Sequence, residues 1–237
     1  MASADLNRVQ DLARVWWEKA EPAVLEAGRL AWTFVPYPEV VSRGLVLEGR
    51  EDPRDHSTAR FRVEPLRVGT PPKISKLPVA ALPTFTGESY VAQRGKKRPV
   101  LVLSMGGPEI PKAVSQGAPG YQRKPCVLVM PYYGVDQDGK RAGFAPEFIT
   151  RIRRTEYPQY MLDTLPVGGS SESVLRLDHV LAVGSAASNF ELSPYRLHAE
   201  AFDLVLDWFR WLVEGDVPAD GLLAMARSDL MRVEAIT

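Results

Sequence analysis

The sequence of 237 residues has few metal-binding and redox-active side chains: a single cysteine, Cys126, and three widely spaced histidines, His56, His179 and His198. One cysteine excludes an internal disulfide framework and a multi-cysteine zinc site, and the histidine spacing contains no local metal-binding motif. Net charge is also absent, because 29 lysines and arginines balance 29 aspartates and glutamates. This balance argues against a surface that is basic throughout, but it allows a local basic patch for nucleic acid.

Long hydrophobic runs are missing as well. No stretch reaches the roughly 18 apolar residues of a membrane-spanning helix, and residues 1–10 lack the apolar run of a signal peptide. Hydrophobic residues make up 45% and charged residues 24% of the chain, which is ordinary globular usage. We therefore expect a soluble, cytoplasmic protein with a buried core and no membrane contact.

Both ends of the chain have helical patterns. Residues 1–35 are predicted to form an N-terminal helical extension, because apolar residues recur there at spacings of three and four: Leu6, Val9, Ala13, Trp16, Ala20 and Val24. Residues 191–237 are predicted to form C-terminal helices packed on the core, the first of them starting at Ser193 and Pro194 and ending at Gly215. That helix is apolar on two sides, which favours a position between the sheet and either a second helix or a second subunit. A shorter closing helix is expected over 219–234.

The middle of the chain, residues 36–190, is predicted to form a β core with long loops. Short apolar or alternating segments indicate strands at 59–64, 98–104, 125–131, 148–153, 173–177 and 179–183. No long helix separates these segments, which argues against a parallel sheet, and we expect a small antiparallel barrel or a strongly bent sheet. The fold class is thus mainly β with flanking helices (α+β). The first strand of the barrel comes from either 44–48 or 78–82.

Basic residues gather at the start of the strand at 98–104, and a second group follows the next hairpin: Arg94, Lys96, Lys97, Arg98, Lys140, Arg141, Arg151, Arg153 and Arg154. Tyrosines lie near both groups, among them Tyr132 and Tyr133. Cationic groups neutralise phosphates and aromatic rings stack on unpaired bases, so the mixture suits single-stranded nucleic acid. A solvated surface with charges at strand ends has the same composition, and on these residues alone both interpretations stay open.

Three segments, in order, resemble the PemK/MazF family of toxin ribonucleases. Gly95–Ser104 (GKKRPVLVLS) is similar to the family's signature, in which an Arg-Pro pair opens an apolar strand. Val127–Tyr133 (VLVMPYY) is similar to the following strand, and Ser171–Asp178 (SESVLRLD) with Val180–Val183 to a later segment. The resemblance covers roughly residues 85–185. It implies an SH3-like barrel, a homodimer that binds RNA along a groove, and an antitoxin protein as partner.

The resemblance also implies an activity: cleavage of single-stranded RNA without metal or cofactor, in which the ribose 2′-hydroxyl attacks the neighbouring phosphate. Arg98 matches the family's catalytic arginine, whose planar guanidinium suits a phosphate. Tyr133 stands where the family has a catalytic threonine, and Glu88 would be its acidic residue. The residues expected to bind RNA are Arg94, Lys96, Lys97, Arg151, Arg153 and Tyr132. Because Tyr133 replaces the threonine, the alternative is a catalytically inactive module of the same type that binds nucleic acid or a protein partner.

Overall fold

The computed structural model describes residues 8–21, 24–55, 57–70, 87–117, 123–136, 143–168, 172–217, 219 and 221–232. The chain divides into two compact units, which are described separately below. The larger unit is formed by Met1–Phe34 together with Lys97–Thr237, and the smaller by Val35–Lys96. Strands β2 and β6 begin in one unit and end in the other.

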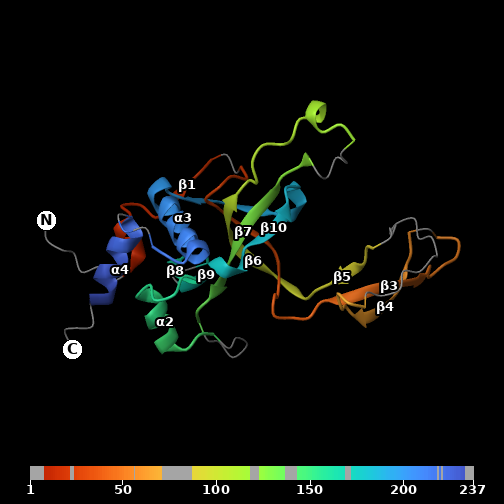
Figure 1. Ribbon diagram of the computed structural model, residues 1–237, viewed down its shortest axis with the longest axis horizontal. Helices are drawn as coiled ribbons and strands as arrows, with labels where there is room; N and C mark the ends of the chain where they lie inside the picture. The colour runs from red at the N-terminus through yellow and green to blue at the C-terminus, as the bar shows by residue number, and fades with distance from the viewer. Residues whose placement is uncertain are drawn as a thin grey trace. The chain divides into compact units, whose positions relative to one another are not determined.

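The larger unit is built on an eight-stranded sheet in the order β1-β11-β2-β6-β7-β9-β8, with β10 also paired to β7. Its strands are β1 (Trp17–Lys19), β2 (Arg29–Pro36), β6 (Gly95–Ser104), β7 (Cys126–Gly134), β8 (Tyr160–Thr164), β9 (Glu172–Arg176), β10 (Leu181–Gly184) and β11 (Glu191–Leu197). One short 3-10 helix precedes them, η1 (Val9–Leu12), and three lie between them: η2 (Lys112–Val114), η3 (Leu177–His179) and η4 (Ala187–Asn189). The sheet is antiparallel and strongly curled into a half-barrel (Figure 1). The prediction of a mainly β, α+β fold with a bent antiparallel sheet is confirmed, whereas its SH3-like identity stays a prediction.

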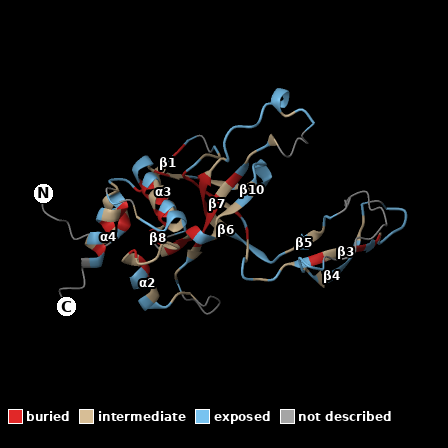
Figure 2. Ribbon diagram, viewed as in Figure 1, coloured by how far each residue is buried: buried red, intermediate tan, exposed pale blue. Residues whose placement is uncertain are grey.

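Helix α3 (Ala199–Glu214) covers one face of this sheet. Its buried residues Leu204, Val205 and Trp208 share a single core with side chains from the strands, among them Leu30, Leu101, Leu103, Met130, Met161 and Leu175. Helix α4 (Leu222–Arg232) adds Leu223 and Leu230 to the same core. Figure 2 shows the buried positions gathered on α3 and on the central strands. The two-sided apolar pattern of α3 is thereby accounted for, because the sheet and α4 both pack against it.

Helix α2 (Pro146–Arg153) packs on β8 and β9. It contacts the side chains of these strands that alternate with the ones facing the main core. Ile149 and Ile152 of α2 form a second cluster with Leu162 of β8 and Val174 of β9. The prediction of a strand at 148–153 is wrong. Ile149 and Ile152 are three residues apart and both are buried on one side of a helix, and Pro146 sits at the first helical position that its fixed φ favours.

The prediction of a helical N-terminal extension over 1–35 is also wrong for the residues that the structure describes from 8 onward. That segment contains only η1, followed by strands β1 and β2. Trp17 of β1 lies opposite Leu197 of β11, and Arg29 of β2 lies opposite Arg196. Pairing with a strand nearly 180 residues away satisfies the backbone here, so tertiary contacts override the local helical periodicity.

The C-terminal helix begins later than predicted. Ser193 and Pro194 belong to β11, and α3 starts at Ala199. The ladder between β11 and β2 is irregular from Leu192 to Arg196, a place where a strand tolerates a proline that has no N–H to donate. The predicted end at Gly215 is confirmed: this residue has φ +87° and its N–H donates to the Trp211 carbonyl at 3.0 Å. No described helix is long and apolar enough to cross a membrane.

We expect Gly215→Ala to lower the free energy of unfolding by about 1–2 kcal/mol, because a Cβ is disfavoured in the left-handed region. No described atom lies within 4 Å of the added Cβ, so the loss reports backbone conformation rather than a clash. Urea denaturation measures it. Glu214→Ala, at the exposed neighbouring position, is the matched control and should change stability by less than about 0.5 kcal/mol. Equal stability of Gly215→Ala and wild type would contradict the assignment of Gly215 as a left-handed helix cap.

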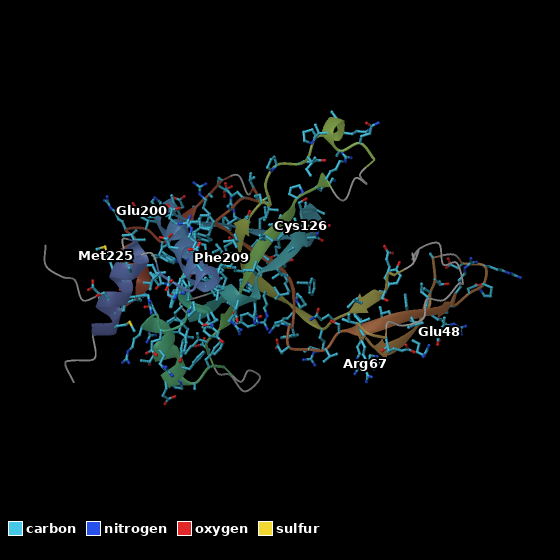
Figure 3. The ribbon with its side chains drawn as sticks, in the orientation of Figure 1. Glu48, Arg67, Cys126, Glu200, Phe209 and Met225 are labelled. Carbon is cyan, nitrogen blue, oxygen red and sulfur yellow. The ribbon has the colours of Figure 1, made fainter. Side chains whose placement is uncertain are left out.

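The smaller unit contains a three-stranded antiparallel sheet in the order β4-β3-β5. Its strands are β3 (Arg43–Gly49), β4 (Arg60–Pro65) and β5 (Tyr90–Ala92). Figure 3 shows side chains along this sheet, including Glu48 of β3. Segment 44–48, one candidate for the first barrel strand, therefore lies in this separate sheet, and the other candidate, 78–82, falls outside the described residues. The predicted boundary at 36 lies one residue from the start of the smaller unit at Val35, whereas no boundary between the two units falls at 190, because β11 belongs to the larger sheet.

Candidate functional site

Arg98 and Tyr133 meet on the face of the sheet opposite α3. In the ladder between β6 and β7, Val100 lies opposite Pro131 and Leu101 opposite Met130. Continuing this antiparallel register by two residues places Arg98 beside Tyr133 and on the same face. The Arg98 guanidinium carbon lies 4.2 Å from the centre of the Tyr133 ring, a cation–π contact.

The other edge of β7 brings in a second set of polar residues. Strand β9 pairs with residues 132–134 of β7 and β10 pairs with residues 126–129, so η3 lies between the two along this edge. Arg176 ends β9, while Asp178 and His179 belong to η3. The short helix thus interrupts the ladder at Met130 and Pro131, and the side chains of Arg176 and His179 reach Tyr133 from there.

Four of these residues form a chain of hydrogen bonds. Asp178 accepts from Arg176 through both carboxylate oxygens, each at 2.8 Å. Arg176 Nη2 lies 2.7 Å from His179 Nε2, and His179 Nδ1 lies 2.9 Å from the Tyr133 hydroxyl oxygen. The side chains of Arg176 and His179 are only 17% and 15% exposed. We call Arg98, Tyr133, Arg176, Asp178 and His179 the polar cluster.

The charges of the cluster reinforce one another. Partial burial would raise the pKa of the Asp178 carboxyl, but the hydrogen bonds and positive charge of Arg176 outweigh it and hold the pKa below its usual value. Burial likewise opposes the charge of Arg176, and Asp178 overcomes it so that the pKa of the guanidinium is raised. The ion pair is therefore intact at neutral pH.

Arginine and tyrosine side chains continue beyond the cluster across the sheet. The Arg176 guanidinium lies 5.7 Å from the Tyr133 ring centre and 4.7 Å from that of Tyr160 on β8. Tyr160 packs edge-on against Tyr157, and Arg151 of α2 lies over the Tyr157 ring at 5.1 Å. We call this series, from Arg98 through Tyr133, Arg176, Tyr160 and Tyr157 to Arg151, the Arg–Tyr row. Each of its guanidinium groups rests on an aromatic face, which fixes its orientation.

Three of the residues expected to bind RNA are held in exposed or half-exposed ion pairs. Arg151 Nε lies 2.6 Å from Glu156, Arg153 Nη2 lies 2.9 Å from Glu172, and Lys97 pairs with Glu191. Ion pairs at such exposure contribute little free energy and exchange readily with another anion. Their assignment to RNA stays a prediction.

Tyr132 requires a correction. Its side chain is 1% exposed and lies in the main core beside Met130 and Leu175. Its hydroxyl donates to Asp163 at 2.9 Å, and burial followed by the nearby carboxylate raises its pKa well above the usual value. A buried ring has no face to offer to a base, so the prediction that Tyr132 binds RNA is wrong. The alternation of the strand explains it, because Tyr132 and Tyr133 point to opposite faces.

The remaining predicted residues, Glu88, Arg94 and Lys96, belong to the smaller unit and are exposed. Within that unit Arg94 lies 5.4 Å from the centre of the Tyr37 ring. They are not part of the polar cluster, which is formed by the larger unit alone. Among the residues that the structure describes, no group of three or more histidine, cysteine or carboxylate side chains could hold a metal ion.

Sequence reasoning missed Arg176 and His179 as functional candidates. Both lie in the segment Arg176–His179 (RLDH), where three polar residues mark the end of a buried strand. A concentration of polar residues at the end of an apolar strand is the signal that could have indicated them. It does not by itself show which strand they would face.

No protein-family model matches the chain, and no curated protein matches it. The resemblance to PemK/MazF toxins is therefore still a prediction, and the chemistry has to be argued from the polar cluster.

Proposed function

We propose that the protein is a cytoplasmic endoribonuclease that cleaves single-stranded RNA without a metal ion. The observation that carries the proposal is the polar cluster, in which Arg98 and Arg176 flank Tyr133 and the imidazole of His179. Two guanidinium groups can hold one phosphate and stabilise the negative charge that grows on it, while an imidazole and a phenol can move protons.

Single-stranded RNA is the substrate that the surroundings of the cluster favour. The Arg–Tyr row offers guanidinium groups to backbone phosphates, and the edges of its rings and its guanidinium planes to unpaired bases. Lys97, Arg151 and Arg153 would add phosphate contacts after exchanging their carboxylate partners. A ribose 2′-hydroxyl, which DNA lacks, is the nucleophile that this chemistry requires.

The proposed reaction starts when a phosphate takes donors of Arg98 and Arg176, which frees His179 Nε2 from its bond to Arg176. The 2′-oxygen attacks phosphorus and its proton passes to Nε2. The bond from phosphorus to the 5′-oxygen breaks, and this oxygen takes the hydroxyl proton of Tyr133, which in turn receives the Nδ1 proton of His179. One proton enters the imidazole and one leaves it, and the products are a 2′,3′-cyclic phosphate and a 5′-hydroxyl.

The resemblance to PemK/MazF toxins extends the proposal to an SH3-like barrel that forms a homodimer and is inhibited by an antitoxin protein. The resemblance gives Arg98 the same role as the polar cluster does, which is to hold the phosphate and stabilise its charge. The threonine of the family is replaced by Tyr133, whose hydroxyl contacts His179 at 2.9 Å. A phenol joined to an imidazole gives this chain a proton path that a threonine at the same position would be too short to supply.

The function is tested by incubating the full-length protein with a long single-stranded RNA of varied sequence in EDTA. We expect cleavage to give cyclic phosphate ends, and Arg98→Ala to lower the rate by about 100-fold or more, since one lost phosphate donor costs that much. Arg210→Ala is the matched control, because Arg210 is an exposed arginine of α3 paired with Asp207. Full activity of Arg98→Ala would contradict the assigned site.

A second candidate is a catalytically inactive module of the same fold that binds nucleic acid or a protein partner. The ion pair between Arg176 and Asp178 favours it, because a guanidinium already held by two carboxylate oxygens is a weaker phosphate ligand. RNA binding at low salt without any cleavage would select this candidate. Absence of both binding and cleavage would contradict both nucleic-acid functions.

A further inference from the structure

We infer that Asp178 is a positioning residue that, through Arg176, sets the tautomer of His179 from which the proposed cleavage starts. The inference rests on the proposed function for its chemical meaning. Its structural part concerns only which ring nitrogen carries the proton, and this can be measured with or without catalysis.

The tautomer follows from donors and acceptors. A guanidinium has only donors, so the nitrogen of His179 that contacts Arg176, Nε2, must be an acceptor with a lone pair. A neutral imidazole that accepts at Nε2 carries its proton at Nδ1. Nδ1 therefore donates to the Tyr133 oxygen, and the hydroxyl proton of Tyr133 points away from the ring.

Asp178 controls this arrangement because it fixes the guanidinium. Its two oxygens bind Nε and Nη2 of Arg176, and the same Nη2 reaches His179. A bidentate carboxylate holds the guanidinium plane in one orientation. His179 Nε2 lies 4.0 Å from Asp178 Oδ2, so the carboxylate acts through the arginine rather than by a direct hydrogen bond.

The reverse tautomer would block the proposed reaction at both nitrogens. With the proton on Nε2, His179 has no lone pair there to accept the 2′-hydroxyl proton. Nδ1 would then accept from Tyr133, so the phenol proton would point at the ring and away from the leaving 5′-oxygen. In serine proteases a wrong imidazole tautomer lowers kcat by about 10⁴-fold, so the tautomer of a catalytic histidine can decide the reaction rate.

The direct test is a two-bond proton–nitrogen correlation spectrum of the full-length, ¹⁵N-labelled protein at a pH where His179 is neutral. We expect the Nδ1 shift of His179 to be that of a protonated nitrogen and the Nε2 shift that of a lone-pair nitrogen. In Asp178→Asn, which loses one acceptor for Arg176, both shifts should move toward the average of the two tautomers. A wild-type His179 protonated at Nε2, or shifts unchanged in Asp178→Asn, would overturn the inference.

The kinetic test uses the same variant. We expect Asp178→Asn to lower kcat for RNA cleavage by about 10- to 100-fold, as loss of an indirect partner typically does, with little change in KM. Asp178→Glu, which restores a carboxylate for Arg176, should recover part of kcat. Asp207→Asn removes an equivalent exposed pair with Arg210 on α3 and should leave both constants unchanged. If the wild type cleaves no RNA, the proposed function fails, while the nitrogen shifts still decide the tautomer.

Discussion

His179→Gln lowers RNA cleavage by about 100- to 10,000-fold while RNA affinity stays within a few-fold of wild type, if His179 transfers protons as proposed. Glutamine has a similar length and can still bond to Arg176 and Tyr133, but it neither takes up nor releases a proton at neutral pH. Rates are measured with a labelled oligonucleotide at saturating protein, and affinity by titration with an uncleavable 2′-deoxy analogue.

His198→Gln is the matched control, because His198 lies at the start of α3 and outside the polar cluster. It should cleave RNA at the wild-type rate. Tyr133→Phe keeps the ring beside Arg98 and removes only the hydroxyl, so the proton path through Tyr133 requires a loss of the same order as in His179→Gln. Activity in Tyr133→Phe together with inactivity in His179→Gln would remove Tyr133 from the path and leave His179 as the sole proton carrier.

Arg98 and Tyr133 were named from the resemblance to PemK/MazF toxins, and the strands that carry them can be recognised locally. Both lie at the ends of short apolar strands flanked by prolines and polar residues, which are readable as strands without any tertiary information. What the sequence could not provide is the register. The pairing of Val100 with Pro131 makes Arg98 and Tyr133 neighbours, and a shift of one residue would have turned Tyr132 toward the arginine instead.

The positions of Arg176, Asp178 and His179 depend on the break in the sheet edge at η3, which no local sequence pattern indicates. Helix η3 interrupts the edge of β7 between β9 and β10, and this interruption places His179 beside Tyr133, 46 residues earlier in the chain. The same limit explains the errors at 148–153 and 1–35. A window of six residues does not separate a period of two from a period of 3.6, and strand pairing over nearly 180 residues leaves no periodic trace near the N-terminus.

Asp163 links the core to the N-terminal strand. This carboxyl of β8 is 1% exposed, accepts from the Tyr132 hydroxyl at 2.9 Å, and receives the Trp17 indole N–H of β1 at 3.4 Å. Burial raises its pKa to about 6, although the hydrogen bonds from Tyr132 and Trp17 oppose the shift. Ionising this buried carboxyl at neutral pH therefore costs more free energy than ionising one in water.

We expect the stability of the protein to fall as the pH rises from about 4 to about 6 because of this residue. Over that range the folded chain holds a proton on Asp163 that the unfolded chain, with a pKa of 3.8, has released, so raising the pH favours unfolding. The contribution amounts to about 3 kcal/mol, from the difference between the two pKa values at 1.36 kcal/mol per pH unit. Asp163→Asn has a neutral side chain at every pH, so the variant lacks this pH-dependent contribution. Because the unfolded carboxyl is already partly ionised at pH 4, the variant should gain about 2 kcal/mol of this in free energy of unfolding, relative to wild type, between pH 4 and pH 7.

Urea denaturation at both pH values measures this difference, and Asp178→Asn provides a control of opposite sign. The pKa of Asp178 is lowered, so the stability it contributes is present above its unfolded pKa near 3.8 and is lost only as the pH falls below that value. Its effect should be nearly constant between pH 4.5 and pH 7, where that of Asp163→Asn still changes. A pH-independent difference between Asp163→Asn and wild type would show that Asp163 is ionised in the folded protein at pH 4, held by Tyr132 and Trp17 strongly enough to overcome its burial.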